Sequence, residues 1–137
     1  MSYLLDTNVI CELIKPNPTV SVVNWVNSTQ NSTLHISVIT LGEIRKGVDG
    51  IKEVNRRENV YQWLETELPA YFGDRILVID RGVANKWGEL QSTKKGCPLP
   101  VIDGLIAATA ITHHLKLVTR NVKDFTNAPV DIINPWK

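Results

Sequence analysis

The sequence predicts an α/β protein in which a mostly parallel sheet of about four or five short strands is flanked by helices on both faces. Short apolar runs without turn residues, such as residues 3–5 and 115–119, alternate with longer segments of helical periodicity. This alternation is typical of a parallel sheet, because parallel strands need crossover connections that are usually helical. The 137 residues fit one domain with a sizeable core, so we expect a single domain over residues 1–137.

The composition is that of an ordinary soluble globular protein, with 43% hydrophobic and 21% charged residues. The formal net charge is +1, so no global basic field points to a polyanionic partner, although a local basic rim remains possible. Cys11 and Cys97 are unclustered and lack neighbouring His ligands, which argues against zinc and for a reduced, cytoplasmic chain. Because no segment resembles a signal peptide or reaches the ~18 apolar residues of a membrane span, we expect no membrane association.

The first element is a buried strand over residues 3–5 that ends at Asp6, after which Thr7 and Asn8 open a helix. Ligands bind at the carboxyl ends of the strands in open parallel sheets. Asp6 is therefore a candidate site residue. The alternative is that Asp6 or Asn8 only caps the helix, since both residue types are good N-caps.

A pair of prolines ends this helix, and Thr19 starts a second one whose apolar face comprises Val20, Val23, Trp25 and Val26. Residues 34–38 alternate as a second strand, in which we interpret His35 as a packed residue. Thr40 and Glu43 then have the spacing of a capping box at the start of the next helix. Glu43 is either a reciprocal cap or a carboxylate that the first helical turn delivers to the edge of the sheet.

Residues 52–68 predict the longest helix, with Val54, Tyr61, Leu64 and Leu68 on its apolar side and a break from Pro69 onward. The remaining elements are a third strand over residues 75–80, a helix over 81–94, a loop over 94–100, a deeply buried helix over 101–110, a fourth strand over 115–119 and a last strand over 130–133. Asp103 lies at the entrance of the buried helix. A carboxylate there is costly to bury unless it is paired, capped or bound to a cation.

Acidic residues recur at positions that a parallel sheet brings together. Asp6 and Asp124 follow strands, while Glu43 and Asp103 lie at helix starts, and strand carboxyl ends share an edge with helix amino ends. Converging carboxylates repel one another, so their pKa values rise or a cation neutralises them. Oxygen ligands without His or Cys suit Mg²⁺ or Mn²⁺, which can activate water and stabilise charge in phosphodiester hydrolysis.

Polar residues beside these acids could support the same chemistry. Thr7, Asn8 and Thr119 could orient carboxylates, water or a substrate phosphate. Cationic side chains lie next to the acidic candidates and could contact nucleic-acid phosphates; they are Arg45, Lys46 and Arg120.

Several motifs, in this order, resemble PIN-domain proteins and, among them, the VapC toxins of bacterial toxin–antitoxin modules, including the FitB-type subgroup. They are Leu5-Asp6-Thr7-Asn8, Glu43 within residues 40–44, the run from Asp103 to Ala110, the run from Thr119 to Phe125, and the closing Ile133-Asn134-Pro135-Trp136. The resemblance covers essentially the whole chain.

The resemblance implies the toxin of a type II toxin–antitoxin system, a Mg²⁺- or Mn²⁺-dependent endoribonuclease that cuts single-stranded or looped RNA, often transfer RNA. It also implies a homodimer that is silenced by a VapB-like antitoxin. Asp6, Glu43 and Asp103 carry over as catalytic, metal-site carboxylates. The family often has Asp directly after the Thr-Arg pair, where this chain has Asn121, so either Asp124 supplies the fourth carboxylate or Asn121 holds a metal-bound water.

Three rival functions can be compared with this one. A phosphatase of the haloacid-dehalogenase type needs a second Asp two residues after the first, where this chain has Asn8. A non-catalytic binding module would use the acidic rim only to receive a basic partner peptide. A DNA-binding regulator that acts with an antitoxin would bind promoter DNA as a complex and not alone.

Overall fold

The computed structural model describes residues 1–92 and 99–137. Within these ranges the chain forms a five-stranded sheet in the order β3-β2-β1-β4-β5, in which every pair of neighbours is parallel. The strands are β1 (Tyr3–Leu5), β2 (Leu34–Ser37), β3 (Ile76–Leu77), β4 (Lys116–Val118) and β5 (Ile132–Ile133). The predicted α/β class with a parallel sheet is therefore confirmed.

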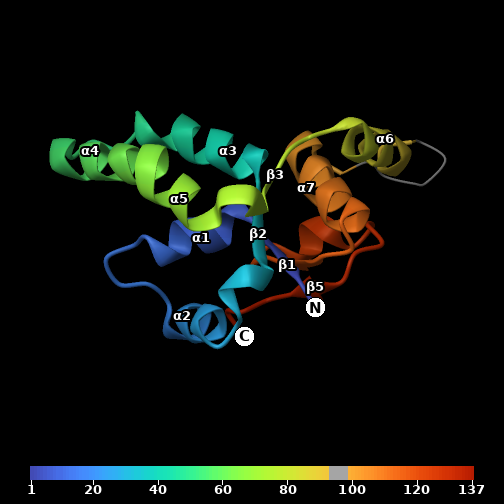
Figure 1. The fold of residues 1–137 in the computed structure, drawn as a ribbon, viewed down its shortest axis with the longest axis horizontal. Helices are drawn as coiled ribbons and strands as arrows, with labels where there is room; N and C mark the ends of the chain where they lie inside the picture. The colour runs from blue at the N-terminus through green and yellow to red at the C-terminus, as the bar shows by residue number, and fades with distance from the viewer. Residues whose placement is uncertain (93–98) are drawn as a thin grey trace.

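Helices cover both sides of this sheet, as Figure 1 shows. The α-helices are α1 (Thr7–Leu13), α2 (Val20–Asn27), α3 (Val38–Val48), α4 (Val54–Gln62), α5 (Leu68–Phe72), α6 (Arg81–Leu90) and α7 (Val101–Thr112). A π-helix, η2 (Trp63–Glu67), joins α4 to α5, and three short 3-10 segments are η1 (Asn31–Thr33), η3 (Gly73–Arg75) and η5 (Val122–Phe125). No helix in the described part of the chain is long and apolar enough to cross a membrane.

The two faces of the sheet build two apolar cores, because successive side chains of a strand point to opposite faces. Leu5 belongs to the larger core with buried residues of α1 to α5, whereas Leu4 belongs to a second core with residues of α7. In Figure 1, α6 and α7 accordingly lie on the other side of the sheet from α1, α4 and α5. Both cores thus anchor β1, the central strand.

Two predicted helix details are wrong near the start of the chain. In α2 the fully buried residue is Val22, while Val20, expected on the apolar face, is 70% exposed. The second strand ends at Ser37, because Val38 already begins α3 and the Ser37 hydroxyl accepts a hydrogen bond from the Ile39 N–H. Ser37 is therefore the N-cap of α3, and Thr40 is not.

The helix expected over residues 52–68 does not break at Pro69. The Leu68 N–H donates to the Trp63 carbonyl, which closes the wide turn of η2, and α5 then starts with Pro69 in its first turn. Proline is tolerated there because first-turn N–H groups have no partner within their own helix. The buried stripe runs through Val60, Leu64, Leu68 and Phe72, whereas Val54 and Tyr61 are exposed.

Several of the remaining elements are shorter than expected, whereas α7, expected over 101–110, extends to Thr112. The third strand comprises only Ile76 and Leu77 and lies at an edge of the sheet, and the last one only Ile132 and Ile133. Helix α6 ends at Leu90. Most of the expected loop over 94–100, including Cys97, lies outside the described residues.

Candidate active site

The candidate site lies where the order of the strands reverses. From β1 the chain adds β2 and β3 on one side and then returns to place β4 and β5 on the other. Ligands of open parallel sheets bind at such a switch point, outside the carboxyl ends of the strands. Asp6 directly follows β1 and Thr119 directly follows β4, and the Thr119 hydroxyl donates to Asp6 Oδ2 at 2.8 Å.

Asp6 caps α1 and also lies near other acidic candidates, so the cap and the site role that its sequence position allowed do not exclude each other. Its carboxylate is 7% exposed, and Oδ1 accepts a hydrogen bond of 2.8 Å from the Thr7 backbone N–H at the start of α1. Burial raises the pKa of Asp6, the bonds from Thr119 and Thr7 lower it, and the charges of Glu43 and Asp124 raise it further. The net effect is a raised pKa, which is typical of carboxylates that face one another.

Hydrogen bonds join the ends of β1 and β4 around Asp6. The buried Thr119 hydroxyl accepts hydrogen bonds from Asn8 Nδ2 and from the Asn121 N–H, each at 3.1 Å. Asn8 Oδ1 accepts a further bond of 3.3 Å from the Arg120 N–H. The expected neighbours Asn8 and Thr119 therefore contact each other and Asp6 across the switch point.

Glu43 is held by Thr7, which Thr40 contacts in turn, and not by its own helix start. The Thr7 hydroxyl donates to Glu43 Oε1 at 2.6 Å, and the Thr40 hydroxyl lies 2.9 Å from the Thr7 oxygen. Since the Thr7 proton is used on Glu43, Thr40 must donate to Thr7. The capping-box interpretation of Thr40 and Glu43 is therefore wrong: Thr40 is fully buried and takes part in the site, a contact for which the sequence offered no separate signal.

Asp103 and Asp124 complete the acidic group from the other side of the switch point. Burial raises the pKa of Asp103 to about 6, and the charges of Asp124, Asp6 and Glu43 add to this effect in that order. Asp103 lies in the first turn of α7, and the exposed Asp124 lies in η5. In the described part of the chain, neither carboxylate receives a hydrogen bond of the kind that holds Asp6.

Two other predicted site residues are placed differently. Asn121 donates its backbone N–H to Thr119, and its side chain is exposed. Arg45 points away from the acids, because it pairs with Asp49 at 3.3 Å and lies 5.4 Å from the centre of the Tyr61 ring. Arg120 remains beside the site and lies over the ring of Trp136.

The donor set fits a hard divalent cation better than it fits zinc or copper, because every candidate ligand is a carboxylate or amide oxygen. The described side chains do not form a ready-made group of three or more His, Cys, Asp or Glu metal ligands. Mg²⁺ does not require one, since it usually binds one or two carboxylates and completes its shell with water and substrate phosphate. The arrangement is thus compatible with an ion that is held jointly by protein and substrate.

The chain matches the family model of the PIN domain over residues 3–130. It is 37% identical over 135 residues to the toxin FitB of Neisseria gonorrhoeae, which covers 97% of each chain. It is 39% identical over 137 residues to the VapC ribonuclease Y4jK of Sinorhizobium fredii, which covers 98% of this chain and 97% of that protein.

The fold of the chain is also similar to those of solved toxin–antitoxin structures. The FitAcB structure from Neisseria gonorrhoeae superposes with a TM-score of 0.90 at 35% identity and covers 98% of both chains. The structure of VapBC2 from Rickettsia felis, bound to a DNA fragment from its promoter, superposes with a TM-score of 0.75 at 27% identity, again over 98% of both chains.

Proposed function

Since the chain belongs to the PIN-domain family, we propose that it is a divalent-metal-dependent endoribonuclease that acts as the toxin of a type II toxin–antitoxin pair. The observation that carries this proposal is the convergence of Asp6, Glu43, Asp103 and Asp124 at the switch point, where burial and the charges of the neighbouring acids raise the pKa values of Asp6 and Asp103. The names of the relatives, a toxin and a ribonuclease, support the same activity.

Mg²⁺ or Mn²⁺ would be held by these carboxylates, with Asp6 at the centre because it lies between the ends of β1 and β4. When bound, such an ion lowers the pKa of a coordinated water and balances the charge of the phosphate that is attacked. The chain's own contribution is orientation: Thr7 and Thr119 fix Asp6, and Thr7 also fixes Glu43. Because these bonds exist before any ion binds, the carboxylates need little rearrangement.

We assign the fourth carboxylate to Asp124 rather than to a residue at position 121. Asp124 is the charge with the largest effect on the pKa of Asp103, and it also raises the pKa of Asp6. Asn121 would then contribute through its amide, by holding a water at the ion. The single Asn in place of the expected Asp weakens ion binding in this proposal but does not abolish it.

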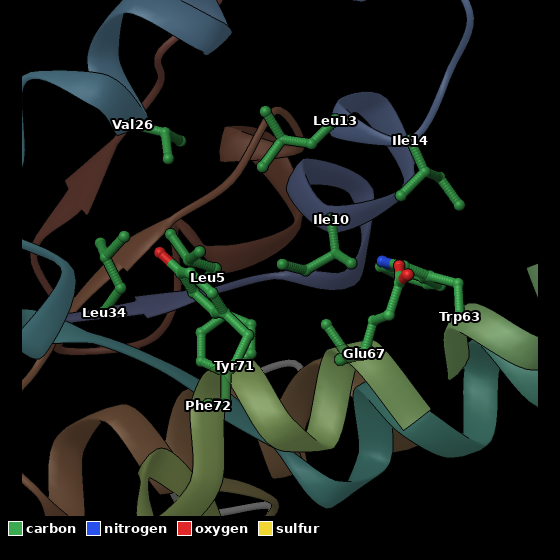
Figure 2. Close-up of a pocket in the computed structure, with 11 residues that line it drawn as sticks. Leu5, Ile10, Leu13, Ile14, Val26, Leu34, Trp63, Glu67, Tyr71 and Phe72 are labelled. Carbon is green, nitrogen blue, oxygen red and sulfur yellow. The ribbon is translucent and has the colours of Figure 1, made fainter. Parts of the chain in front are cut away.

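The proposed partner is a small VapB-like antitoxin, as in the toxin–antitoxin complexes that this chain resembles. An apolar pocket of about 380 Å³ beside α1 offers a surface for such a partner, and Figure 2 shows Ile10, Leu13 and Ile14 pointing into it opposite Trp63 and Tyr71. We extend the proposal to a homodimer and to a cytoplasmic location, where an RNA substrate is found.

The experiment that tests this function is cleavage of a total small-RNA pool by the antitoxin-free chain with Mg²⁺, with Mn²⁺ and with EDTA. Asp6→Asn is the control for contaminating nucleases, and circular dichroism verifies that it folds. We expect discrete metal-dependent products that decrease by about a hundredfold or more in Asp6→Asn, since a metal ligand is lost. Equal cleavage by both proteins, or none by a folded wild type, would overturn the proposal.

A second candidate function is promoter binding with the antitoxin, with weak or no catalysis by the chain itself. The observation that favours it is that similar complexes were solved bound to DNA, including FitAB with the IR36 fragment. It predicts DNA binding by the complex, none by the chain alone, and no RNA cleavage. The two functions can coexist, and the cleavage assay separates the catalytic one from the purely regulatory one.

A further inference from the structure

A groove of about 650 Å³, lined mostly by charged and polar residues, adjoins the acidic site at the carboxyl edge of the sheet, where η5 meets the segment after β5. We name it the Trp136 groove, and the residues that matter here are Arg120, Lys123, Asn134, Trp136 and Lys137. We propose that this groove binds one strand of the RNA substrate, with phosphates on its cations and a base stacked on the Arg120–Trp136 pair. This inference rests on the ribonuclease function proposed above.

The groove is continuous with the acidic site through strand β4. Thr119 donates to Asp6, and Arg120 is the next residue, with its backbone N–H on Asn8. Trp136 follows β5, which pairs with β4 up to Val118 and Ile133 and continues with a bond from the Thr119 N–H to the Ile133 carbonyl. Asn121 and Asp124 line the groove as well, so a strand that lies in it reaches Asp124, one of the four carboxylates, directly.

The cations of the groove have no acidic partner within the described part of the chain. Its Arg120, Lys123 and Lys137 side chains make no ion pair there, and the Arg120 guanidinium donates no hydrogen bond. Elsewhere, by contrast, arginines are used internally: Arg56 and Arg57 donate to backbone carbonyls. Three exposed cations against the single acid Asp124 make a local basic patch in a chain of net charge +1. Such a patch is the electrostatic match for a phosphate backbone.

The aromatic part of the groove is held in a fixed position. The Trp136 backbone N–H donates to Asn134 Oδ1 at 3.0 Å, and the indole ring packs against the larger core. Arg120 Cζ lies over the ring, 5.4 Å from its centre, which is the distance of a cation–π contact. The indole Nε1 is buried without an acceptor among the described residues, so the ring contributes its face and not a hydrogen bond.

The flat guanidinium of Arg120 and the indole ring of Trp136 favour binding of unpaired bases. Single-stranded RNA is recognised by stacking its exposed bases on aromatic rings or arginine planes, whereas the bases of a duplex already stack on one another. An acidic peptide would satisfy the cations but would leave the flat surface unused. The combination of cations with a stacking platform therefore favours a single RNA strand as the occupant.

The test is the affinity of the full chain for a short, fluorescently labelled single-stranded RNA and for a matched duplex, in EDTA so that metal-dependent cleavage is suppressed. Lys123→Gln and Arg120→Gln remove cations of the groove. Lys116→Gln is the matched control, because Lys116 lies at the opposite, amino end of β4. Trp136→Leu removes the ring, and Trp136→Phe restores an aromatic face. Thermal melts identify any variant that fails to fold.

We expect Arg120→Gln and Trp136→Leu to weaken binding of the single strand by about tenfold, with Trp136→Phe recovering most of the loss. Lys123→Gln should reduce the slope of log affinity against log salt by about 0.7, the value for one lost phosphate contact in single strands. Lys116→Gln should bind as the wild type does, and the duplex should bind more weakly than the single strand.

If the wild type, Lys123→Gln and Arg120→Gln bind the single strand with equal affinity, the proposal that this groove binds RNA is wrong. If the wild type still cleaves RNA with Mn²⁺ in a parallel assay, the ribonuclease function survives that failure. If the wild type neither binds nor cleaves RNA, both proposals fail. If the variants lose affinity only for the antitoxin, the occupant is a peptide, and the RNA assignment is wrong.

Discussion

The two halves of the acidic site are built differently. Asp6 and Glu43 form a held half, in which hydroxyl and backbone donors of Thr7 and Thr119 contact the carboxylates. Asp103 and Asp124 form an open half, placed by the first turn of α7 and by η5, with no such hydrogen bond in the described part of the chain. The difference teaches that one half is fixed by the chain's own donors, while the other would be free to adjust to the divalent ion proposed above.

The pKa values express the same contrast. Burial raises the pKa of both Asp6 and Asp103, but only Asp6 has hydrogen bonds that work in the opposite direction. Hydrogen bonds to the charged form stabilise it, so the bonds from Thr119 and Thr7 offset part of the rise that burial causes in the pKa of Asp6. Asp103 lacks this compensation, and repulsion from the other acids adds to its desolvation. A divalent cation would therefore change the open half more than the held half.

The largest expected effect comes from breaking the held half. Thr7→Val removes the donor to Glu43 and the contact with Thr40, so Glu43 is no longer oriented. We expect Mn²⁺ affinity, measured by calorimetry, and the rate of RNA cleavage to fall by about 10- to 100-fold. Thr66→Val is the control, because that exposed hydroxyl only donates to the Gln62 carbonyl. Similar losses in both variants would contradict a special role of Thr7.

The second prediction disturbs the support beneath the open half. A Cβ on Gly104 would lie 2.6 Å from Gln91 Nε2 and 3.2 Å from Trp87, and Gln91 is held in place by two bonds of 2.8 Å to the Leu99 backbone. We expect Gly104→Ala to lower the free energy of unfolding by about 1–3 kcal/mol, because α6 and α7 must separate.

The matched control for Gly104→Ala is Gly88→Ala in α6, where an added Cβ meets nothing within 4 Å. That change should stabilise the helix by roughly 0.5–1 kcal/mol, since Ala forms helices better than Gly. Urea unfolding measures both variants. A Gly104→Ala variant as stable as the wild type would show that the close packing of α6 on α7 does not constrain the first turn of α7.

The third prediction concerns the pH dependence of stability in the metal-free protein. Folding raises the pKa of the Asp103 carboxyl from 3.8 to about 6. The contribution of this group to the free energy of unfolding is therefore most favourable below pH 4, and it falls as the pH rises from 4 to about 6. After allowance for solvent screening we expect a loss of about 1 kcal/mol. The Asp103→Asn substitution should remove this loss of stability.

Urea unfolding in EDTA at pH 4 and pH 7 checks this expectation. The wild type and Asp103→Asn should be nearly equally stable at pH 4, and the variant should be more stable at pH 7. Asp131→Asn, at an exposed position away from the acidic site, serves as the control. A wild type whose advantage over Asp103→Asn grows with pH would contradict the sign of the effect.

The smallest effect is expected from adding charge to the open half. Asn121→Asp introduces another carboxylate beside Thr119 and should tighten Mg²⁺ binding by about two- to tenfold, because a charged ligand replaces a neutral one at the edge of the site. Calorimetric titration measures it. Unchanged affinity would mean that position 121 does not face the ion.

Backbone periodicity explains what the sequence could predict. Strand β1 followed by Asp6 and the apolar helix α7 with Asp103 at its start were expected, because strand and helix periods place these residues at one edge of a parallel sheet. The ordered motifs of the PIN family pointed to the same residues. The convergence of four acids followed from topology alone.

Specific side-chain and backbone contacts, both distant and local, explain what the sequence could not predict. Thr40 has the spacing of a cap, but its hydroxyl lies on Thr7, a residue 33 positions away. Arg45 lies two residues after Glu43, yet its side chain pairs with Asp49 at the end of α3 and not with the acidic site. Pro69 predicted a break because a π-helical turn that lets α5 restart has no distinct sequence signal. The Thr40 contact depends on tertiary packing, which local patterns do not encode, whereas the other two outcomes depend on local contacts without a distinct sequence signal.

The most direct test of the central claim, that both halves form one electrostatic site, is an NMR titration of the Asp103 side-chain carboxyl. In the metal-free chain we predict a pKa of about 6, a lower value in Asp6→Asn, and a further decrease when Mg²⁺ is added. A carboxyl that titrates near 3.8 and responds to neither change would show that Asp103 is independent of Asp6, and would contradict the account.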